Sequence, residues 1–157
     1  MSEHAVMKRP LGRHEALELM ASAGVGRVVV SEGALPAVHL VAFALDRECV
    51  VFRAPTDSPL AKAALDTVVA FQADRIDRAA QTGWTSTVTG HASRVRDASA
   101  VAHLDRLLPD IDGDGAETVW IRVTTEFVTG LVAERRDHTG RPAGPDLPYA
   151  RKPPPVA

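Results

Sequence analysis

The chain contains few of the features that mark secreted, membrane-spanning or nucleic-acid-binding proteins. It has a single cysteine, Cys49, so it cannot form an internal disulfide. No apolar run approaches the ~20 residues of a membrane-spanning helix, and the first residues have no apolar signal core. Lysine and arginine are scattered and the net charge is −2, so no basic surface matches a phosphate backbone. We therefore expect a cytoplasmic protein that binds neither nucleic acid nor membranes.

Motifs for nucleophilic or metal catalysis are missing too. There is no Gly-x-Ser-x-Gly motif, and the six histidines lack the spacing of zinc ligands. The stretch 110–121, "DIDGDGAETVWI", starts like a calcium loop, but Ile121 stands where such a loop needs a glutamate. The sequence therefore predicts no metal site and leaves the catalytic residues unknown. If the protein is an enzyme, a cofactor supplies the chemistry.

Short apolar runs separated by turns make up most of the chain. They predict six strands, at 27–31, 37–45, 48–54, 68–74, 85–95 and 118–134, the last of them broken near Thr124 and Thr125. Helical periodicity and capping residues predict three short helices, at 12–23, 59–66 and 97–109. The connections between the first three strands are too short for parallel pairing, so these strands are antiparallel. The expected fold is mainly β with short helices, with six antiparallel strands curled into a barrel.

The composition of the chain changes near residue 135. Residues 1–134 carry the expected strands and helices, and a chain of this length forms one domain. Residues 135–157 are rich in proline, glycine and charge, and they end in "KPPPVA". We expect this C-terminal tail to be an extended arm or disordered.

The segment "VVFRAPTDSPLAK" is the strongest candidate for a binding site. Arg53 ends a strand, Ser58 is a good N-cap for the helix that follows, and Lys62 lies one turn into that helix. Free backbone N–H groups and the positive end of a helix dipole favour a phosphate at such a junction. The alternative is a capped surface helix, with Arg53 and Asp57 as a solvated ion pair.

Aromatic residues are scarce, with four phenylalanines, two tryptophans and one tyrosine, so the place of each one matters. Trp84 stands beside Gly83 in "TGWTSTVTGHASRV", just before the expected strand 85–95. A core residue would more naturally lie within the run. We therefore expect Trp84 at the rim of the barrel, where it can contact a partner subunit or a flat ligand.

The succession of "VGRVVV", "VVFRAPTDSPLAK" and "TGWTSTVTGHASRV" resembles the pyridoxamine 5'-phosphate oxidase-like family, the FMN-binding split β-barrels, in its actinobacterial branch. The resemblance spans residues 11–131. It implies that residues 1–134 form an FMN-binding, six-stranded antiparallel split β-barrel, which is a homodimer with FMN at the interface. The FMN contacts that it implies are Arg53, Ser58 and Lys62 at the phosphate, strand residues including Val41 and Val51 beside the ring, Trp84 at the ring or ribityl chain, and Gln72 in the same cleft.

Two positions depart from the pattern of this family. Ala42 stands where relatives commonly carry an asparagine, and Pro59 stands where they often carry a lysine. The resemblance implies a flavin-dependent oxidoreductase that acts on a small organic substrate by hydride or electron transfer, and the departures leave a deazaflavin coenzyme open. The alternative is a module without catalysis that binds or senses a flavin or haem, with His39 or His91 as the axial haem ligand.

Overall fold

The computed structural model describes residues 5–110, 115–137 and 139–141. In chain order these residues form β1 (Ala5–Pro10), α1 (Arg13–Ala21), β2 (Val25–Glu32), β3 (Leu35–Asp46), β4 (Cys49–Pro55), α2 (Pro59–Ala64), β5 (Val68–Asp77), β6 (Thr82–Val95), α3 (Ala98–Leu107), β7 (Thr118–Val123) and β8 (Phe127–Arg136). None of the three helices in this part of the chain is long and apolar enough to cross a membrane.

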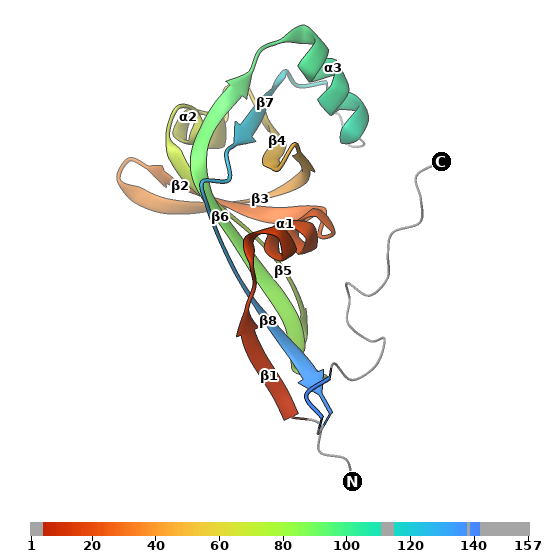
Figure 1. Cartoon of the computed structure of the whole chain (residues 1–157). Helices are drawn as coiled ribbons and strands as arrows, with labels where there is room; N and C mark the ends of the chain where they lie inside the picture. The colour runs from red at the N-terminus through yellow and green to blue at the C-terminus, as the bar shows by residue number, and fades with distance from the viewer. Residues whose placement is uncertain (1–4, 111–114, 138, 142–157) are drawn as a thin grey trace.

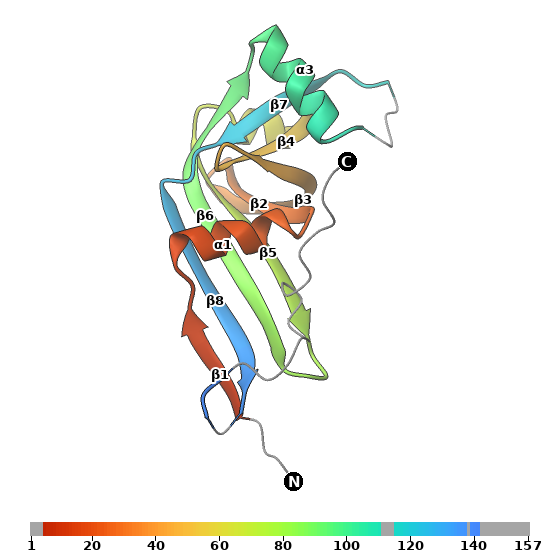
Figure 2. The same cartoon turned by 45° about the vertical axis from the view of Figure 1, so that its right-hand side comes forward.

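Six of the strands form a closed antiparallel barrel, which confirms the fold predicted from the sequence. Neighbouring strands pair in the order β6, β5, β2, β3, β4 and β7, and a further pairing of β7 with β6 closes the ring. The strands β8 and β1 add to a free edge of β6. Figures 1 and 2 show them leaving the barrel, with the ends of β5 and β6, as a narrow sheet below α1. We call this sheet the arm (residues 5–10, 74–77, 82–85 and 131–136).

The strand β6 joins the arm to the barrel because it changes partner along its 14 residues. Gly83 to Thr89 pair with β8, whereas residues 92–95 pair with β7. At the change, a Cβ on Gly90 would lie 1.7 Å from the carbonyl oxygen of Thr124, so only glycine fits. The predicted break near Thr124 is thus confirmed, and it separates β7 from β8.

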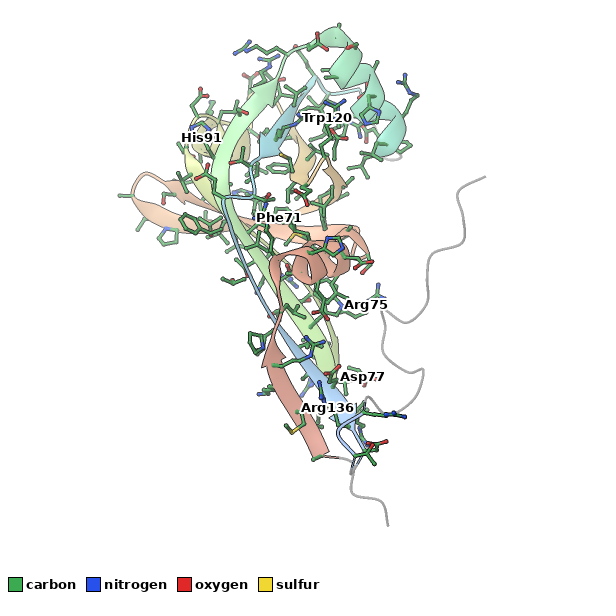
Figure 3. The ribbon with its side chains drawn as sticks, in the orientation of Figure 1. Phe71, Arg75, Asp77, His91, Trp120 and Arg136 are labelled. Carbon is green, nitrogen blue, oxygen red and sulfur yellow. The ribbon has the colours of Figure 1, made fainter. Side chains whose placement is uncertain are left out.

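Inward-facing side chains of the barrel strands form the main core. The rings of Phe43 and Phe71 have centroids 4.6 Å apart, and the ring of Phe52 stacks with that of Phe71 at 6.3 Å. Figure 3 shows Phe71 in the middle of the barrel. The helix α1 covers one end of this core, where the hydroxyl of Ser86 donates to the carbonyl oxygen of Ala16 at 3.0 Å.

The helix α3 covers a second, smaller cluster on the outside of the barrel. Leu104 packs there against Val51 of β4 and Trp120 of β7. Leu107, which the helical pattern predicts to face inward, is 41% exposed, so that prediction is wrong. The reason is that the helix ends at Leu107, and the non-helical residue Leu108 packs against the cluster in its place.

The hairpin of β5 and β6 is longer than predicted. The sequence predicts a polar loop from Arg75 to Gly83, but Arg75 pairs with Trp84, and the ladder continues to Asp77. Gly83 has a φ of +147°, and a Cβ there would lie 2.2 Å from the carbonyl oxygen of Arg75. A polar sequence can form these strands because one face of the arm is open to solvent.

Other boundaries also differ from the expected ones. The strand β1 is not predicted, and it pairs Ala5 with Arg136, so β8 runs past residue 134, the predicted end of the last strand. The helix α2 ends at Ala64 rather than Asp66, because Leu65 is already extended and Asp66 has a φ of +62°. Most of the predicted tail (142–157) and the centre of the calcium-like stretch (111–114) lie outside the described residues.

An ion-pair network ties the arm to α1. Glu134 is 1% exposed, and its Oε1 accepts hydrogen bonds from Arg9 at 3.0 Å and from Arg136 at 2.6 Å. Arg9 also donates to both carboxylate oxygens of Glu15, at 2.8 and 3.1 Å. Burial alone would raise the pKa of Glu134, but the hydrogen bonds from Arg136 and Arg9 hold it below its ordinary value. The hydrogen bond from Arg9 likewise lowers the pKa of Glu15.

We expect Glu134→Gln to lower the free energy of unfolding at pH 7 by about 1–3 kcal/mol, because two arginines lose their shared counter-charge. A carboxylate with a lowered pKa in the folded state stabilises the fold above its ordinary pKa, and this contribution is lost as pH falls through the folded value. The difference between wild type and variant should therefore shrink as the pH falls from neutral toward about 3. Urea unfolding over this pH range measures it.

The matched control is Glu18→Gln, which removes the charge of an exposed α1 glutamate 4.0 Å from His14. It should change the unfolding free energy by less than about 0.5 kcal/mol. Equal urea midpoints for the two variants would show that the network adds no stability.

Candidate functional site

A pocket of about 500 Å³ opens where β3 and β4 separate. Its walls come from β3, β4, the start of α2 and the segment after α3, and its lining residues are His39, Leu40, Val41, Ala42, Arg53, Ala54, Pro55, Ser58, Pro59, Leu60, Leu108, Pro109 and Asp110. We call it the β3–β4 pocket. It brings together three of the predicted site residues, Val41, Arg53 and Ser58.

The β3 wall of this pocket is an open strand edge. The strand β4 pairs with β3 only from Phe43 to Asp46. The backbone N–H of Phe43 donates to Gly24, toward β2. Because backbone groups of a strand point alternately to its two sides, those of Leu40 and Ala42 point to the other side, away from β2 and toward the pocket. The pocket therefore has backbone donors and acceptors along one wall.

Arg53 lies between the pocket and α3. Its side chain is 16% exposed, and it donates hydrogen bonds to the carbonyl oxygen of Leu108 at 2.6 Å and to Asp105 Oδ1 at 3.1 Å. The guanidinium also lies over the ring of Trp120, 4.3 Å from the centroid. Figure 3 shows Trp120 beneath α3. The alternative that pairs Arg53 with Asp57 is wrong, because Asp105 is the carboxylate that pairs with Arg53.

Sequence reasoning missed Trp120, Asp105 and Leu108. Trp120 reads as an ordinary residue of the last strand, and Asp105 as part of the solvated face of an amphipathic helix. No spacing in the sequence relates either residue to Arg53. Only the scarcity of tryptophan was a signal that Trp120 has a special place.

The expected phosphate loop is only partly assembled at the pocket. Ser58 caps α2, and its hydroxyl accepts a hydrogen bond from the N–H of Ala61 at 3.1 Å, as predicted for an N-cap. Pro59 lines the pocket but has no N–H to donate. Lys62 is exposed on α2 and does not line the pocket. The cap residue Ser58 and the first two residues of α2, Pro59 and Leu60, thus form part of the wall, and Arg53 is the cation that lines it.

The other predicted ring contacts lie at different depths. Val41 is half-buried and lines the pocket. Val51 is fully buried beneath α3, and Gln72 is half-buried on β5 between Arg27 and Thr87. Neither Val51 nor Gln72 lines the β3–β4 pocket.

Trp84 is a core residue, which corrects its expected place at the rim. It is 1% exposed and belongs to the main core. The reason is that β6 begins at Thr82, earlier than predicted, so Trp84 lies inside the strand. Its ring also borders a second pocket of about 480 Å³ in the arm, next to Gly83 and Ile76, and its indole N–H has no hydrogen-bond partner among the described residues.

The two strand histidines have different surroundings. His39 lines the β3–β4 pocket, and its Nε2 lies 2.6 Å from Glu32 Oε1. His91 is exposed on β6, and Figure 3 shows it on the opposite side of the barrel from Trp120. Of the two, His39 is thus the one placed to contact a ligand in this pocket.

The outer side of the sheet next to the pocket exposes several large apolar side chains, with the Arg27–Asp74 ion pair among them. We call it the outer apolar face, and its large exposed side chains are Val25, Val38, Leu40, Val68, Phe127 and Leu131. The helix α3 covers the outside of β4 and β7, but these side chains remain 43–70% exposed in the described chain. Leu40 belongs both to this face and to the pocket. Large exposed apolar side chains grouped in this way are a candidate interaction surface.

Comparisons with known proteins agree with this architecture. A family model described as pyridoxamine 5'-phosphate oxidase matches residues 12–132. An uncharacterised protein of Mycobacterium tuberculosis is 36% identical over 133 residues, which are 80% of this chain and 87% of the relative. A solved FAD-binding protein from Mycobacterium smegmatis is 25% identical, with a TM-score of 0.64 over 80% of this chain and 98% of the other. A conserved protein from Corynebacterium diphtheriae is 27% identical, with a TM-score of 0.66 over 80% and 97%.

We expect Trp84→Ala to lower the free energy of unfolding by about 3–5 kcal/mol without any ligand, because it empties a large volume in the core. Ile76→Ala is the matched control, since Ile76 borders the same arm pocket but is 58% exposed. Urea unfolding of both variants checks this. If Trp84→Ala costs as little as Ile76→Ala, Trp84 does not support the core.

Proposed function

Because the chain belongs to the pyridoxamine 5'-phosphate oxidase family, we propose that it is a flavin-dependent oxidoreductase that binds FMN in the β3–β4 pocket. It passes hydride or electrons between the flavin and a small organic substrate. One observation carries the proposal: the pocket combines an open strand edge with a cation, Arg53, at its wall. A flavin ring needs hydrogen bonds to its heteroatoms, and its phosphate needs a positive partner.

The residues of the pocket fit these needs. The backbone groups of Leu40 and Ala42 can hydrogen-bond a flat heterocycle without any special side chain, so the absence of asparagine at Ala42 does not remove the donors. Arg53 keeps further N–H donors beyond those used by Leu108 and Asp105. Bound flavin would supply the redox chemistry, and the protein would position it and exclude water.

A second copy of the chain is the proposed occupant of the outer apolar face. Leu40 and Ala42 line the pocket at the edge of this face, so a docked copy would close the pocket from one side. The other predicted contacts, Gln72 and Trp84, do not line the β3–β4 pocket of their own chain. A homodimer with the cofactor at its interface offers a way for the half-buried Gln72 to contribute, whereas Trp84 is 1% exposed and supports the site only through the core.

Both FMN and FAD belong to the proposed class of cofactor. The related protein from Mycobacterium smegmatis is described as FAD-binding, and FAD and FMN share the ring and the first phosphate. FMN is the cofactor that we propose. The other ligands to titrate are FAD, a deazaflavin coenzyme and haem. His39 would be the axial ligand for haem, although Glu32 already engages its Nε2.

We expect the double variant Arg53→Ala with Lys62→Ala to lose bound flavin, because it removes the candidate cations near the phosphate. A charge-assisted hydrogen bond is worth about 1.5–3 kcal/mol, so the affinity for FMN should fall roughly tenfold to a hundredfold. Arg53→Ala alone should account for most of the loss, since Lys62 does not line the pocket. Quenching of flavin fluorescence during titration measures the affinity.

Arg94→Ala is the control, because it removes an exposed arginine on β6. Unchanged FMN affinity in the double variant would refute the phosphate contact. Failure of the wild type to bind any of the flavins would refute the flavin proposal, and a Soret band after haem addition without flavin binding would favour the haem alternative.

We expect Leu40→Asp to convert a dimer into a monomer, because it places a charge in the proposed apolar contact beside the pocket. Light scattering during size-exclusion chromatography measures the mass, and flavin retention should fall in the same variant. Leu107→Asp is the matched control, because Leu107 is exposed on α3 rather than on the outer apolar face. A monomeric wild type, or a dimeric Leu40→Asp, would contradict the proposed interface.

A further inference from the structure

Arg53 is shared between the β3–β4 pocket and a carboxylate that lies outside it. Arg53 lines the pocket, and so does Leu108, whose carbonyl oxygen accepts a hydrogen bond from Arg53 Nη1 at 2.6 Å. Nη2 points to Asp105 Oδ1 at 3.1 Å. Asp105 is not among the residues that line the pocket. The charge of Arg53 is therefore partly neutralised from behind, by α3.

Asp105 is fixed in place by a second donor. The indole N–H of Trp120 donates to the same Oδ1 at 2.8 Å, and the Arg53 guanidinium lies 4.3 Å from the centroid of the Trp120 ring. The hydrogen bond from Trp120, and after it that from Arg53, lowers the pKa of Asp105 against the effect of burial. Asp105 thus carries a full negative charge at neutral pH.

A phosphate in the pocket would compete with the Asp105 carboxylate for Arg53. Phosphate and carboxylate oxygens both accept hydrogen bonds from a guanidinium, and even where free N–H donors remain, two anions beside one cation share its charge and repel each other. We propose that Asp105 competes with a phosphorylated ligand for Arg53, so that the ligand binds by drawing Arg53 away from α3. This inference rests on the proposed function. Asp105 therefore weakens the binding of phosphate to this pocket.

The exchange also involves the wall of the pocket. The Arg53 guanidinium holds the Leu108 carbonyl at the end of α3, and the packing of this helix centres on the single buried residue Leu104. A ligand that takes Arg53 therefore loosens the contact that fixes Leu108. Occupancy of the pocket and the position of the C-terminal end of α3 are coupled in this way.

The variant Asp105→Asn tests the competition, because it keeps the side-chain oxygen that accepts from Trp120 and Arg53 but removes the charge. Its affinity for FMN should rise about threefold to fivefold, which is the range for a partly exposed ion pair. Its affinity for riboflavin, which has the ring but no phosphate, should not change. The readout is thus the ratio of FMN to riboflavin affinity, which a general effect on folding would not move.

Asp97→Asn is the matched control on the same helix. Asp97 caps α3 by accepting from the N–H of Ala100 at 2.9 Å, and asparagine is an equally good cap. The control makes the same change in net charge, but it leaves Arg53 untouched. An equal FMN-to-riboflavin ratio in Asp105→Asn and Asp97→Asn would overturn the inference.

Inorganic phosphate provides a test that does not need the flavin. In a Trp84→Phe background, Trp120 is the one remaining tryptophan of the sequence, and it reports on the guanidinium above its ring through its fluorescence. Phosphate should bind Asp105→Asn more tightly than Asp97→Asn. If the wild type binds neither FMN nor riboflavin, the proposed function fails. Separately, equal phosphate affinities in Asp105→Asn and Asp97→Asn would overturn the competition.

Discussion

The close approach of Gly90 to Thr124 is the constraint on which the rest of the structure depends. It lets β6 exchange β8 for β7 without a side chain between the strands. The pairing with β7 closes the barrel, and the pairing with β8 creates the arm. Closure in turn brings β7 beside β4, which places Trp120 directly opposite Arg53 in the strand register. A barrel contact outside the pocket therefore determines the surroundings of the pocket's arginine.

Where β3 separates from β4, backbone hydrogen-bonding groups are left without strand partners, in contrast to the paired strands that close the barrel. The two strands pair from Phe43 to Asp46 and then diverge, and the pocket lies in the opening. Unpaired backbone groups are costly when they are buried. A ligand or a second copy of the chain that covers this opening must therefore replace their contacts with water. The exposed apolar side chains around Leu40 favour such a cover, because they gain by leaving water.

The fold was more predictable than the site, and the difference has a physical cause. Alternating patterns and turn residues act over a few neighbours, so the barrel strands, the cap at Ser58 and the break at Thr124 follow from local sequence. Trp84 was misplaced because the start of β6 depends on its pairing with Arg75 and Val132, which no local pattern records. The sequence predicts Arg53 as a binding residue, but not its partners, which come from α3 and β7. Such contacts arise only when the barrel closes.

The charges around the pocket show the same dependence on distant segments. Arg53 is balanced by Asp105 of α3, and His39 is balanced by Glu32 at the end of β2. Neither carboxylate lines the pocket. Arg53 in the wall is thus engaged from behind by Asp105, and the lining itself contains a carboxylate residue, Asp110, so the pocket has little net charge to attract an anion. Under the proposed function, the shape of the pocket and its strand edge would select the ligand, and a phosphate would gain only what remains after Asp105 is displaced from Arg53.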